Sequence, residues 1–174
     1  AEYVRVPYAD MGLTPIPASV TYEQALFTGD ILSSGFWGAE IANINQGDCV
    51  AVIGAGPVGL CAAESAKYLG AGTVVIIDRD EFRLRLAEKN RLADVTVQNG
   101  VQDAENTVRE LTEGRGADAV IEAAGGKDTF ELAWKLARPN AVVSIVAMYE
   151  EAQILPLPSM YGKNLIFKTG GVDA

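Results

Sequence analysis

Apolar, β-branched runs alternate along most of the chain with stretches of helical periodicity. The apolar runs lie at 50–53, 74–77, 95–97, 119–121, 142–146 and 165–167. The helical stretches between them lie at 58–69, 81–90, 103–113 and 129–136. Continuous apolar strands separated by helices are typical of a parallel sheet that is covered on both faces. We therefore predict an α/β fold, a single domain with a doubly wound parallel sheet of about six strands.

The first 47 residues follow a different pattern. Residues 2–6 alternate like a strand, and three prolines then interrupt regular structure. A helical stretch at 31–44 leads into the first strand of the sheet. An opening strand without an evident partner suggests the remnant of a neighbouring domain. We expect residues 1–17 to be that remnant and residues 18–174 to form the sheet domain, truncated at its C-terminal end.

Composition and charge narrow the possible partners. The 174 residues are 49% hydrophobic and 21% charged, with a net charge of −9. An acidic chain is a poor partner for nucleic acid or an anionic membrane, because both require a basic surface. No apolar run is long enough for a membrane helix, and the start of the chain does not resemble a signal peptide. We expect a cytoplasmic protein.

The chain has few residues for metal or proton-transfer chemistry. It contains no histidine and two cysteines, Cys49 and Cys61. One falls in an apolar run and the other in a helical stretch, so we expect both to be small buried groups. With no Cys-x-x-Cys motif and no histidine, the chain cannot build a tetrahedral nitrogen and sulfur site by itself.

A glycine-rich segment follows the first apolar run and opens a helical stretch. Residues 54–59, Gly-Ala-Gly-Pro-Val-Gly, have the form GxGxxG. In this context Gly54 permits a tight turn, Gly56 lets the backbone approach a pyrophosphate, and Gly59 lets the helix pack closely on the sheet. Pro57 and Val58 fill the loop and begin the helix, whose free N–H groups favour an anion. A plain strand–helix turn is the alternative interpretation.

A carboxylate follows the second apolar run. Asp78 lies about 20 positions after Gly59, the spacing of the acidic residue that binds the adenosine ribose in a Rossmann fold. Its charge would repel a 2′-phosphate, which indicates NAD rather than NADP. Arg79 and Arg83 weaken that preference, because an arginine nearby can accommodate the phosphate. A solvated strand end is the alternative for Asp78.

With these motifs in order, the chain resembles the coenzyme domain of zinc-dependent medium-chain alcohol dehydrogenases, nearest to their secondary-alcohol and threonine-dehydrogenase-like branch. The segments that carry the resemblance are 2–7, 30–36, 54–59, 114–118 and 163–171. The resemblance implies hydride transfer between NAD and an alcohol or carbonyl substrate, assisted by zinc, in a homo-oligomer. It also implies a preceding catalytic domain, absent here, that carries the Cys and His-Glu zinc ligands. The chain alone should bind NAD without turnover.

The resemblance also assigns roles to residues before the glycine segment. Asp30 matches a position that supplies a carboxylate ligand to the catalytic zinc in the secondary-alcohol branch. Its alternative is an ordinary helix N-cap, because it precedes a helical stretch. Ser34 matches a hydroxyl residue beside the nicotinamide, and its alternative is an unremarkable helical serine.

The remaining assignments follow the later strands. Arg83 matches a basic residue near the adenosine ribose, with a solvated helix face as its alternative. Ala123 and Ala124 match the rim of the adenosine pocket. The stretch of Val146, Ala147 and Met148 matches backbone that faces the carboxamide, while their side chains are expected in the core.

Three alternatives stay open. A zinc-free reductase of the quinone-reductase kind would need no carboxylate at position 30. A nucleotide-sensing module without catalysis would end near these termini. A methyltransferase is a third possibility, because sites for S-adenosylmethionine also use glycine-rich loops. The Pro-Val filling of the glycine segment and the number of strands favour NAD.

Overall fold

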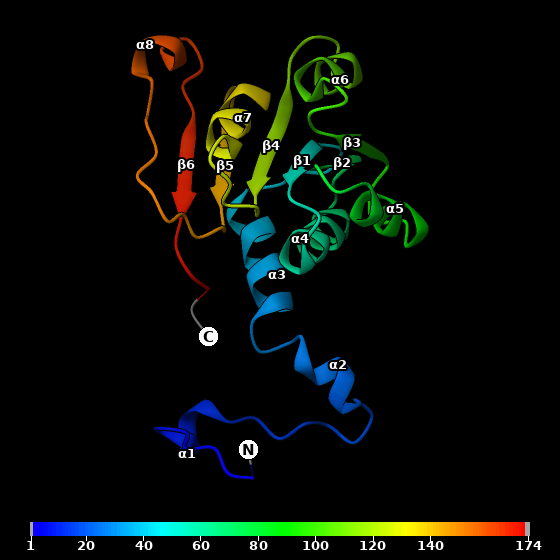
Figure 1. The fold of residues 1–174 in the computed structure, drawn as a ribbon, viewed down its shortest axis with the longest axis vertical. Helices are drawn as coiled ribbons and strands as arrows, with labels where there is room; N and C mark the ends of the chain where they lie inside the picture. Colours follow the sequence, from blue (N-terminus) through cyan, green and yellow to red (C-terminus); the bar gives the residue numbers. More distant parts are fainter. Residues whose placement is uncertain (1, 173–174) are drawn as a thin grey trace.

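The computed structural model describes residues 2–172 and contains one six-stranded sheet with helices on both faces (Figure 1). The strands are β1 (Cys49–Ile53), β2 (Thr73–Asp78), β3 (Val95–Gln98), β4 (Ala117–Glu122), β5 (Ala137–Ile145) and β6 (Ile166–Thr169). The helices are α1 (Ala9–Gly12), α2 (Tyr22–Leu26), α3 (Ile31–Ile41), α4 (Pro57–Tyr68), α5 (Glu81–Lys89), α6 (Ala104–Leu111), α7 (Thr129–Leu136) and α8 (Leu157–Met160). The predicted α/β architecture is confirmed.

The strand order determines where a ligand site can form. The sheet runs β3-β2-β1-β4-β5-β6, and every neighbouring pair is parallel. The chain therefore leaves β1 in one direction and returns to its other side with β4. In doubly wound sheets, ligands bind in the crevice outside the carboxyl ends of the strands at this switch point.

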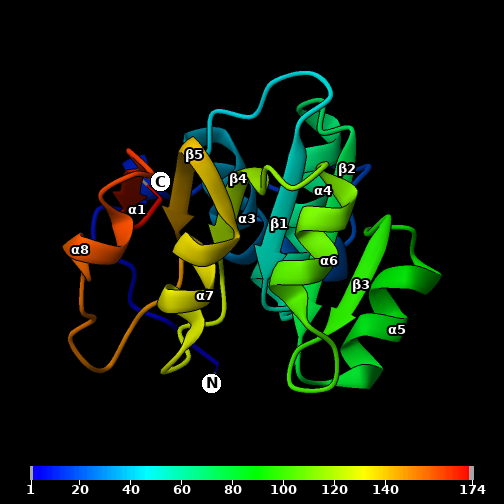
Figure 2. The same cartoon turned by 90° about the horizontal axis from the view of Figure 1, so that it is seen from above.

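Two apolar layers cover the sheet. Side chains of β1 alternate between them, with Val50 and Val52 facing α3, α4 and α5, and Ala51 and Ile53 facing α6 and α7 (Figure 2). All four side chains are buried. Because both faces are covered, the strands carry continuous apolar runs, as the sequence indicated.

Close packing fixes α3 against α4 and β5. A Cβ atom on Gly35 would lie 2.6 Å from Cys61 Cβ, and one on Gly38 would lie 2.5 Å from Val146 Cγ2. Neither gap admits a side chain without movement. These contacts fix the position of α3 relative to α4 and the end of β5. The first turn of α3, which contains Ser34, therefore has a fixed position beside the switch point.

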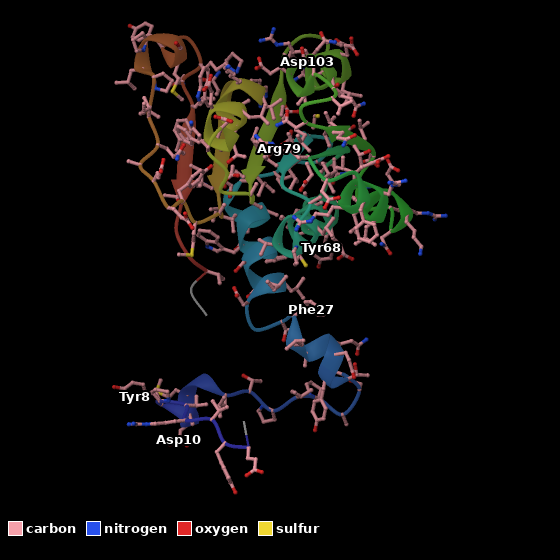
Figure 3. All side chains as sticks on the ribbon, viewed as in Figure 1. Tyr8, Asp10, Phe27, Tyr68, Arg79 and Asp103 are labelled. Carbon is pink, nitrogen blue, oxygen red and sulfur yellow. The ribbon has the colours of Figure 1, made fainter. Side chains whose placement is uncertain are left out.

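The expected opening strand is wrong. Residues 2–6 form no strand, and their side chains are exposed. The segment before α3 extends away from the sheet (Figure 1), and the side chains of Tyr8 and Asp10 lie in it (Figure 3). Tyr8 is 87% exposed. An alternating pattern forms a strand only where a partner supplies hydrogen bonds and an apolar face, and the described part of the chain supplies neither to this segment.

Helix boundaries agree with the sequence to within a few residues, and the helices differ in whether a side chain caps them. Asp80 and Asp103 cap α5 and α6 by accepting hydrogen bonds from Phe82 N (2.8 Å) and Asn106 N (3.0 Å). Asp128 precedes α7, yet its side chain makes no capping hydrogen bond. Its carboxylate instead lies 3.7 Å from Arg79.

The expectation that both cysteines are buried is confirmed for Cys49 and only in part for Cys61. Cys49 is buried in β1, and burial raises the pKa of its thiol to about 11. Cys61 in α4 is half-buried, with a pKa raised by the same cause. Neither thiol is therefore a ready nucleophile at neutral pH.

One carboxylate ties three strands together at the amino end of the sheet. Asp118 accepts hydrogen bonds from Cys49 N (2.8 Å) and Arg138 Nε (2.6 Å), and Arg115 lies 3.4 Å away. Burial alone would raise the pKa of Asp118, but these hydrogen bonds and charges outweigh it and hold the pKa below its ordinary value.

We expect Asp118→Asn to destabilise the fold by about 1–3 kcal/mol at neutral pH, since a hydrogen-bonded charge is lost. A lowered carboxyl pKa stabilises the fold above its unfolded value, and this stability disappears as the pH falls through the folded pKa. The difference between parent and variant should therefore shrink below about pH 4. Urea midpoints at pH 7 and pH 3 measure it. The exposed Asp10→Asn is the control, and an unchanged difference at low pH would contradict the assignment.

Within residues 2–172, no helix combines the length and the apolar character needed to cross a bilayer.

Candidate functional site

The glycine segment lies at the switch point, between the end of β1 and the start of α4. Gly54 has φ +101°, a left-handed conformation, and a Cβ atom there would lie 3.1 Å from the Ala123 backbone. Gly56 is the N-cap of α4 and Pro57 is its first residue. No side chain caps this helix and no acidic residue lies in its first turn. Its first N–H groups are therefore available to an anion.

Gly59 is placed by packing. A Cβ atom on Gly59 would lie 1.9 Å from the carbonyl oxygen of Gly54. Only a residue without a side chain permits this approach, so α4 can begin directly under the loop. Gly56 differs, because a Cβ atom there would meet only Arg83 Nη1, at 3.8 Å. The space above Gly56 is a shallow cradle that a side chain would fill.

Asp78 is bonded to the glycine segment as well as being near it. Its Oδ2 accepts a hydrogen bond from Ala55 N at 2.6 Å, and its Oδ1 accepts one from Asp80 N at 2.8 Å. Each carboxylate oxygen retains a second lone pair for a ligand. The sequence did not predict the hydrogen bond from Ala55 N to Asp78, because residue spacing does not show which backbone amide a carboxylate at the end of a strand reaches.

A cavity of about 250 Å³ brings the first group of predicted residues together. Its lining includes Gly54, Gly56, Asp78, Arg79, Arg83, Ala123 and Ala124, all singled out in the sequence, together with Ile53, Ile77, Asn99, Gly126 and Thr129. Both arginines have only loose acidic partners, at 3.7 Å. The lining therefore joins helix N–H groups and two weakly paired guanidinium groups to one carboxylate.

A second, wider hollow of about 830 Å³ adjoins the first at Ala123. Its lining includes Asp30, Ser34, Val58, Val146, Ala147 and Met148 from the sequence prediction, together with Ile145, Tyr149 and residues 169–172. Pro57 and Gly59 line neither space. The two hollows together follow the crevice along the carboxyl ends of β2, β1, β4 and β5.

Asp30 occupies the N-cap position of α3 without capping it. Its side chain makes no capping hydrogen bond, and its Oδ1 accepts one from Ser34 Oγ at 3.0 Å. The N-cap interpretation of its carboxylate is therefore wrong, and the metal interpretation stays a prediction. Within residues 2–172, no three His, Cys, Asp or Glu side chains gather to hold a metal. Asp30 offers one ligand, and zinc requires more than these residues provide.

The side chains of the stretch after β5 differ from expectation. Met148 is 93% exposed, so its predicted core position is wrong. Val146 and Ala147 are half-buried. Strand β5 ends at Ile145, and the chain then leaves the sheet along the wide hollow. The apolar residues continue past the end of the strand, so the sequence does not show that Met148 lies outside the core.

Sequence reasoning missed Asn99, Thr129 and Tyr149 as lining residues. Asn99 could have been found, because it directly follows β3 and the carboxyl ends of parallel strands converge on one edge. Thr129 begins α7, and Tyr149 lies in an irregular loop. No spacing rule identifies either of them.

Comparisons with known proteins agree with this geometry. The sequence profile of the family described as Zinc-binding dehydrogenase matches residues 57–169. An alcohol dehydrogenase of Cupriavidus necator is 46% identical over 157 residues, covering 90% of this chain and 43% of the relative. The NADP-dependent isopropanol dehydrogenase of Thermoanaerobacter brockii is 35% identical over 170 residues, covering 97% and 48%.

Solved structures give the same result. The alcohol dehydrogenase TADH from Thermus sp. ATN1 superposes with a TM-score of 0.90 at 38% identity, covering 96% of this chain and 48% of that one. Zinc dependent alcohol dehydrogenase 2 from Streptococcus pneumonia superposes with a TM-score of 0.91 at 30% identity, covering 98% and 49%. The chain spans about half the length of these relatives. It belongs to the zinc-binding dehydrogenase family and has the Rossmann-type fold of the cofactor-binding half of medium-chain alcohol dehydrogenases.

Proposed function

We propose that this chain binds NAD as the cofactor domain of a zinc-dependent dehydrogenase that interconverts a secondary alcohol and its carbonyl product. One observation carries the proposal. The uncapped N-terminus of α4, the cradle above Gly56 and the Asp78 carboxylate lie around a single cavity at the switch point. These groups match the pyrophosphate and ribose of a dinucleotide in charge and hydrogen-bonding type.

Each residue then has a role in holding the cofactor. The first N–H groups of α4 would bind the pyrophosphate, and Asp78 would accept hydrogen bonds from the ribose hydroxyls. Ala123 and Ala124 would flank the adenosine, while Ser34 and the backbone of 146–148 would face the nicotinamide. NAD supplies the hydride chemistry when bound, and the domain positions it. This assignment of residues is a proposal.

We propose NAD rather than NADP because the Asp78 carboxylate is negative and would repel a 2′-phosphate. Two features restrict the size of this preference. Arg79 and Arg83 line the same cavity with weak acidic partners, and a relative from Thermoanaerobacter brockii is NADP-dependent by name. We therefore expect a measurable but incomplete discrimination between the two cofactors.

NADH binding by the 174-residue chain tests the proposal directly. We expect nicotinamide fluorescence to change on titration with NADH, and ADP-ribose to compete. Circular dichroism confirms that the sample is folded. A folded chain that binds no NADH at millimolar concentration would refute the proposal.

Zinc content tests the role proposed for Asp30. We expect the chain to bind zinc below stoichiometry, because a catalytic zinc takes three protein ligands and Asp30 supplies one. Elemental analysis after dialysis measures it. Where the chain is joined to a domain that supplies the other ligands, zinc and activity should appear together, and Asp30→Ala should lower both. Tight stoichiometric zinc in this chain would show that Asp30 has been misassigned.

Residues 1–17 are proposed to belong to the catalytic domain, and a small alcohol or carbonyl compound is the proposed substrate. We also propose a homo-oligomer formed through β6, which is an edge strand of the sheet. Ile166 in this strand is 51% exposed, whereas Leu165 and Phe167 pack against the core. The cytoplasm remains the expected location.

A further inference from the structure

A carboxylate that the cofactor assignment does not use lies at the end of β4, next to Ala123, which lines both hollows. Glu122, the last residue of β4, has 0% of its surface exposed. Its Oε1 accepts hydrogen bonds from Ala124 N and Gly125 N, each at 2.9 Å. Its main-chain oxygen accepts hydrogen bonds from Val146 N at 2.9 Å and Ala147 N at 3.1 Å. One residue therefore holds both the loop at 123–126 and the loop at 146–149.

A hydroxyl pair joins the same two loops a second time. Tyr149 Oη lies 3.1 Å from Thr129 Oγ1, and Thr129 Oγ1 donates to the carbonyl oxygen of Gly126 at 2.8 Å. The two hydroxyls therefore share a hydrogen bond next to the bond that ties Thr129 to Gly126. Thr129 lines the narrow cavity and Tyr149 lines the wide hollow, so the bond crosses from one to the other.

The second carboxylate oxygen of Glu122 faces the same place. Glu122 Oε2 is buried and makes no well-formed hydrogen bond among the described residues, although the Glu122 carboxylate lies close enough to Tyr149 to raise its pKa. Burial raises the pKa of Tyr149 far above its usual range, the hydrogen bond to Thr129 opposes this only in part, and the charge and a hydrogen bond of Glu122 raise the pKa further. The phenol therefore stays protonated at neutral pH. One oxygen of Glu122 thus holds the 123–126 loop, while the other is buried beside the tyrosine without an amide partner.

The loops also touch directly. Gly125 has φ +65°, and a Cβ atom there would lie 2.6 Å from the carbonyl oxygen of Met148. Neither loop can shift along the other without breaking this contact. A dinucleotide that extends from the narrow cavity into the wide hollow would contact both loops, so their relative position affects how well its two ends bind together.

We propose that Glu122, Thr129 and Tyr149 form a positioning cluster that locks the 123–126 and 146–149 loops in register, so that the adenosine and nicotinamide halves of a bound dinucleotide reinforce each other. The inference rests on the proposed function. It differs from a purely structural role because it concerns the coupling between two halves of one ligand.

The test compares NADH with ADP-ribose, which lacks the nicotinamide. Tyr149→Phe removes the hydroxyl that reaches Thr129 but leaves Thr129 bonded to Gly126 and Glu122 bonded to its loop amides. ADP-ribose affinity should therefore stay within about twofold of the parent chain, whereas NADH affinity should fall about three- to tenfold, the effect of one hydrogen bond. Isothermal titration of the 174-residue chain with each ligand gives the ratio.

Matched variants separate coupling from general damage. Tyr161→Phe removes a hydroxyl from a residue that is 93% exposed and should leave both affinities unchanged. Glu122→Gln retains an oxygen for both loop amides and should stay close to the parent, whereas Glu122→Leu removes the acceptor and should weaken both ligands. Urea midpoints report the stability of each variant.

The outcomes are distinguishable. A lower ratio of NADH to ADP-ribose affinity in Tyr149→Phe alone supports the cluster. Equal losses for both ligands, or no loss, overturn it even where the parent binds NADH as proposed. A parent chain that binds neither ligand refutes the proposed function, and the cluster with it.

Discussion

Gly59→Ala is expected to destabilise the fold by about 3 kcal/mol, the upper end for an overpacked core, and to remove measurable NADH binding. The added Cβ would lie 1.9 Å from Gly54 O, a main-chain atom that no rotamer change can move. The start of α4 must therefore shift away from β1, which carries its N–H groups away from the proposed pyrophosphate site. Urea denaturation and NADH fluorescence titration measure the two effects.

Gly56→Ala is the matched comparison, because its Cβ would meet only the end of a flexible arginine, at 3.8 Å. Gly56 has φ −74°, which alanine adopts freely. Stability should therefore be close to that of the parent, while NADH affinity falls because the methyl group fills the cradle. Gly162→Ala, with no atom within 4 Å of its added Cβ, should change neither. Equal binding by the Gly56→Ala variant and the parent would place the pyrophosphate elsewhere.

The sheet could be predicted because its physics is local and repetitive. A parallel strand that is buried on both faces must be apolar throughout. The apolar run at 74–77 therefore predicts a strand even when its neighbours in the sheet are not known. The segment at 2–6 has an alternating pattern instead, and that pattern specifies a strand only together with its neighbour. The same limit explains β5, whose start at Ala137 lies before its apolar run and depends on pairing with β4.

The site could be predicted where a motif fixes both residue type and spacing. The glycine segment, Asp78 and the Ala123 rim all meet at one crevice. What the sequence could not show is which contacts a side chain makes within the site. Asp30 bonds to Ser34 instead of capping α3. Glu122 directly follows the apolar run at 119–121, and nothing in the sequence shows which loop amides its carboxylate reaches. These contacts depend on the distances between segments that are remote along the chain.

Asp78→Ala is expected to weaken NADH binding by about ten- to a hundredfold, since hydrogen bonds to a charged group contribute about 1.5–3 kcal/mol. Two causes contribute to this loss. The variant lacks the acceptor for the ribose hydroxyls, and it also releases Ala55 N from its 2.6 Å bond, which loosens the glycine segment. A measurement of NADH affinity alone cannot distinguish these two roles of Asp78, the binding of the ribose and the stabilisation of the glycine segment.

The ratio of NADH to NADPH affinity separates them. A loosened loop weakens both cofactors equally, because both carry the same pyrophosphate. Loss of the carboxylate charge weakens NADH binding, whereas for NADPH it removes a repulsion of the 2′-phosphate. Arg79 and Arg83 lie beside that phosphate position. Their acidic partners are 3.7 Å away and leave both side chains able to turn toward a phosphate. The ratio should therefore fall in Asp78→Ala and stay unchanged in Asp103→Asn, which alters a carboxylate outside the cavity lining and keeps a residue suited to its helix cap. Parallel fluorescence titrations with the two cofactors give the answer. If both affinities fall by the same factor, Asp78 supports the loop and another group selects the cofactor.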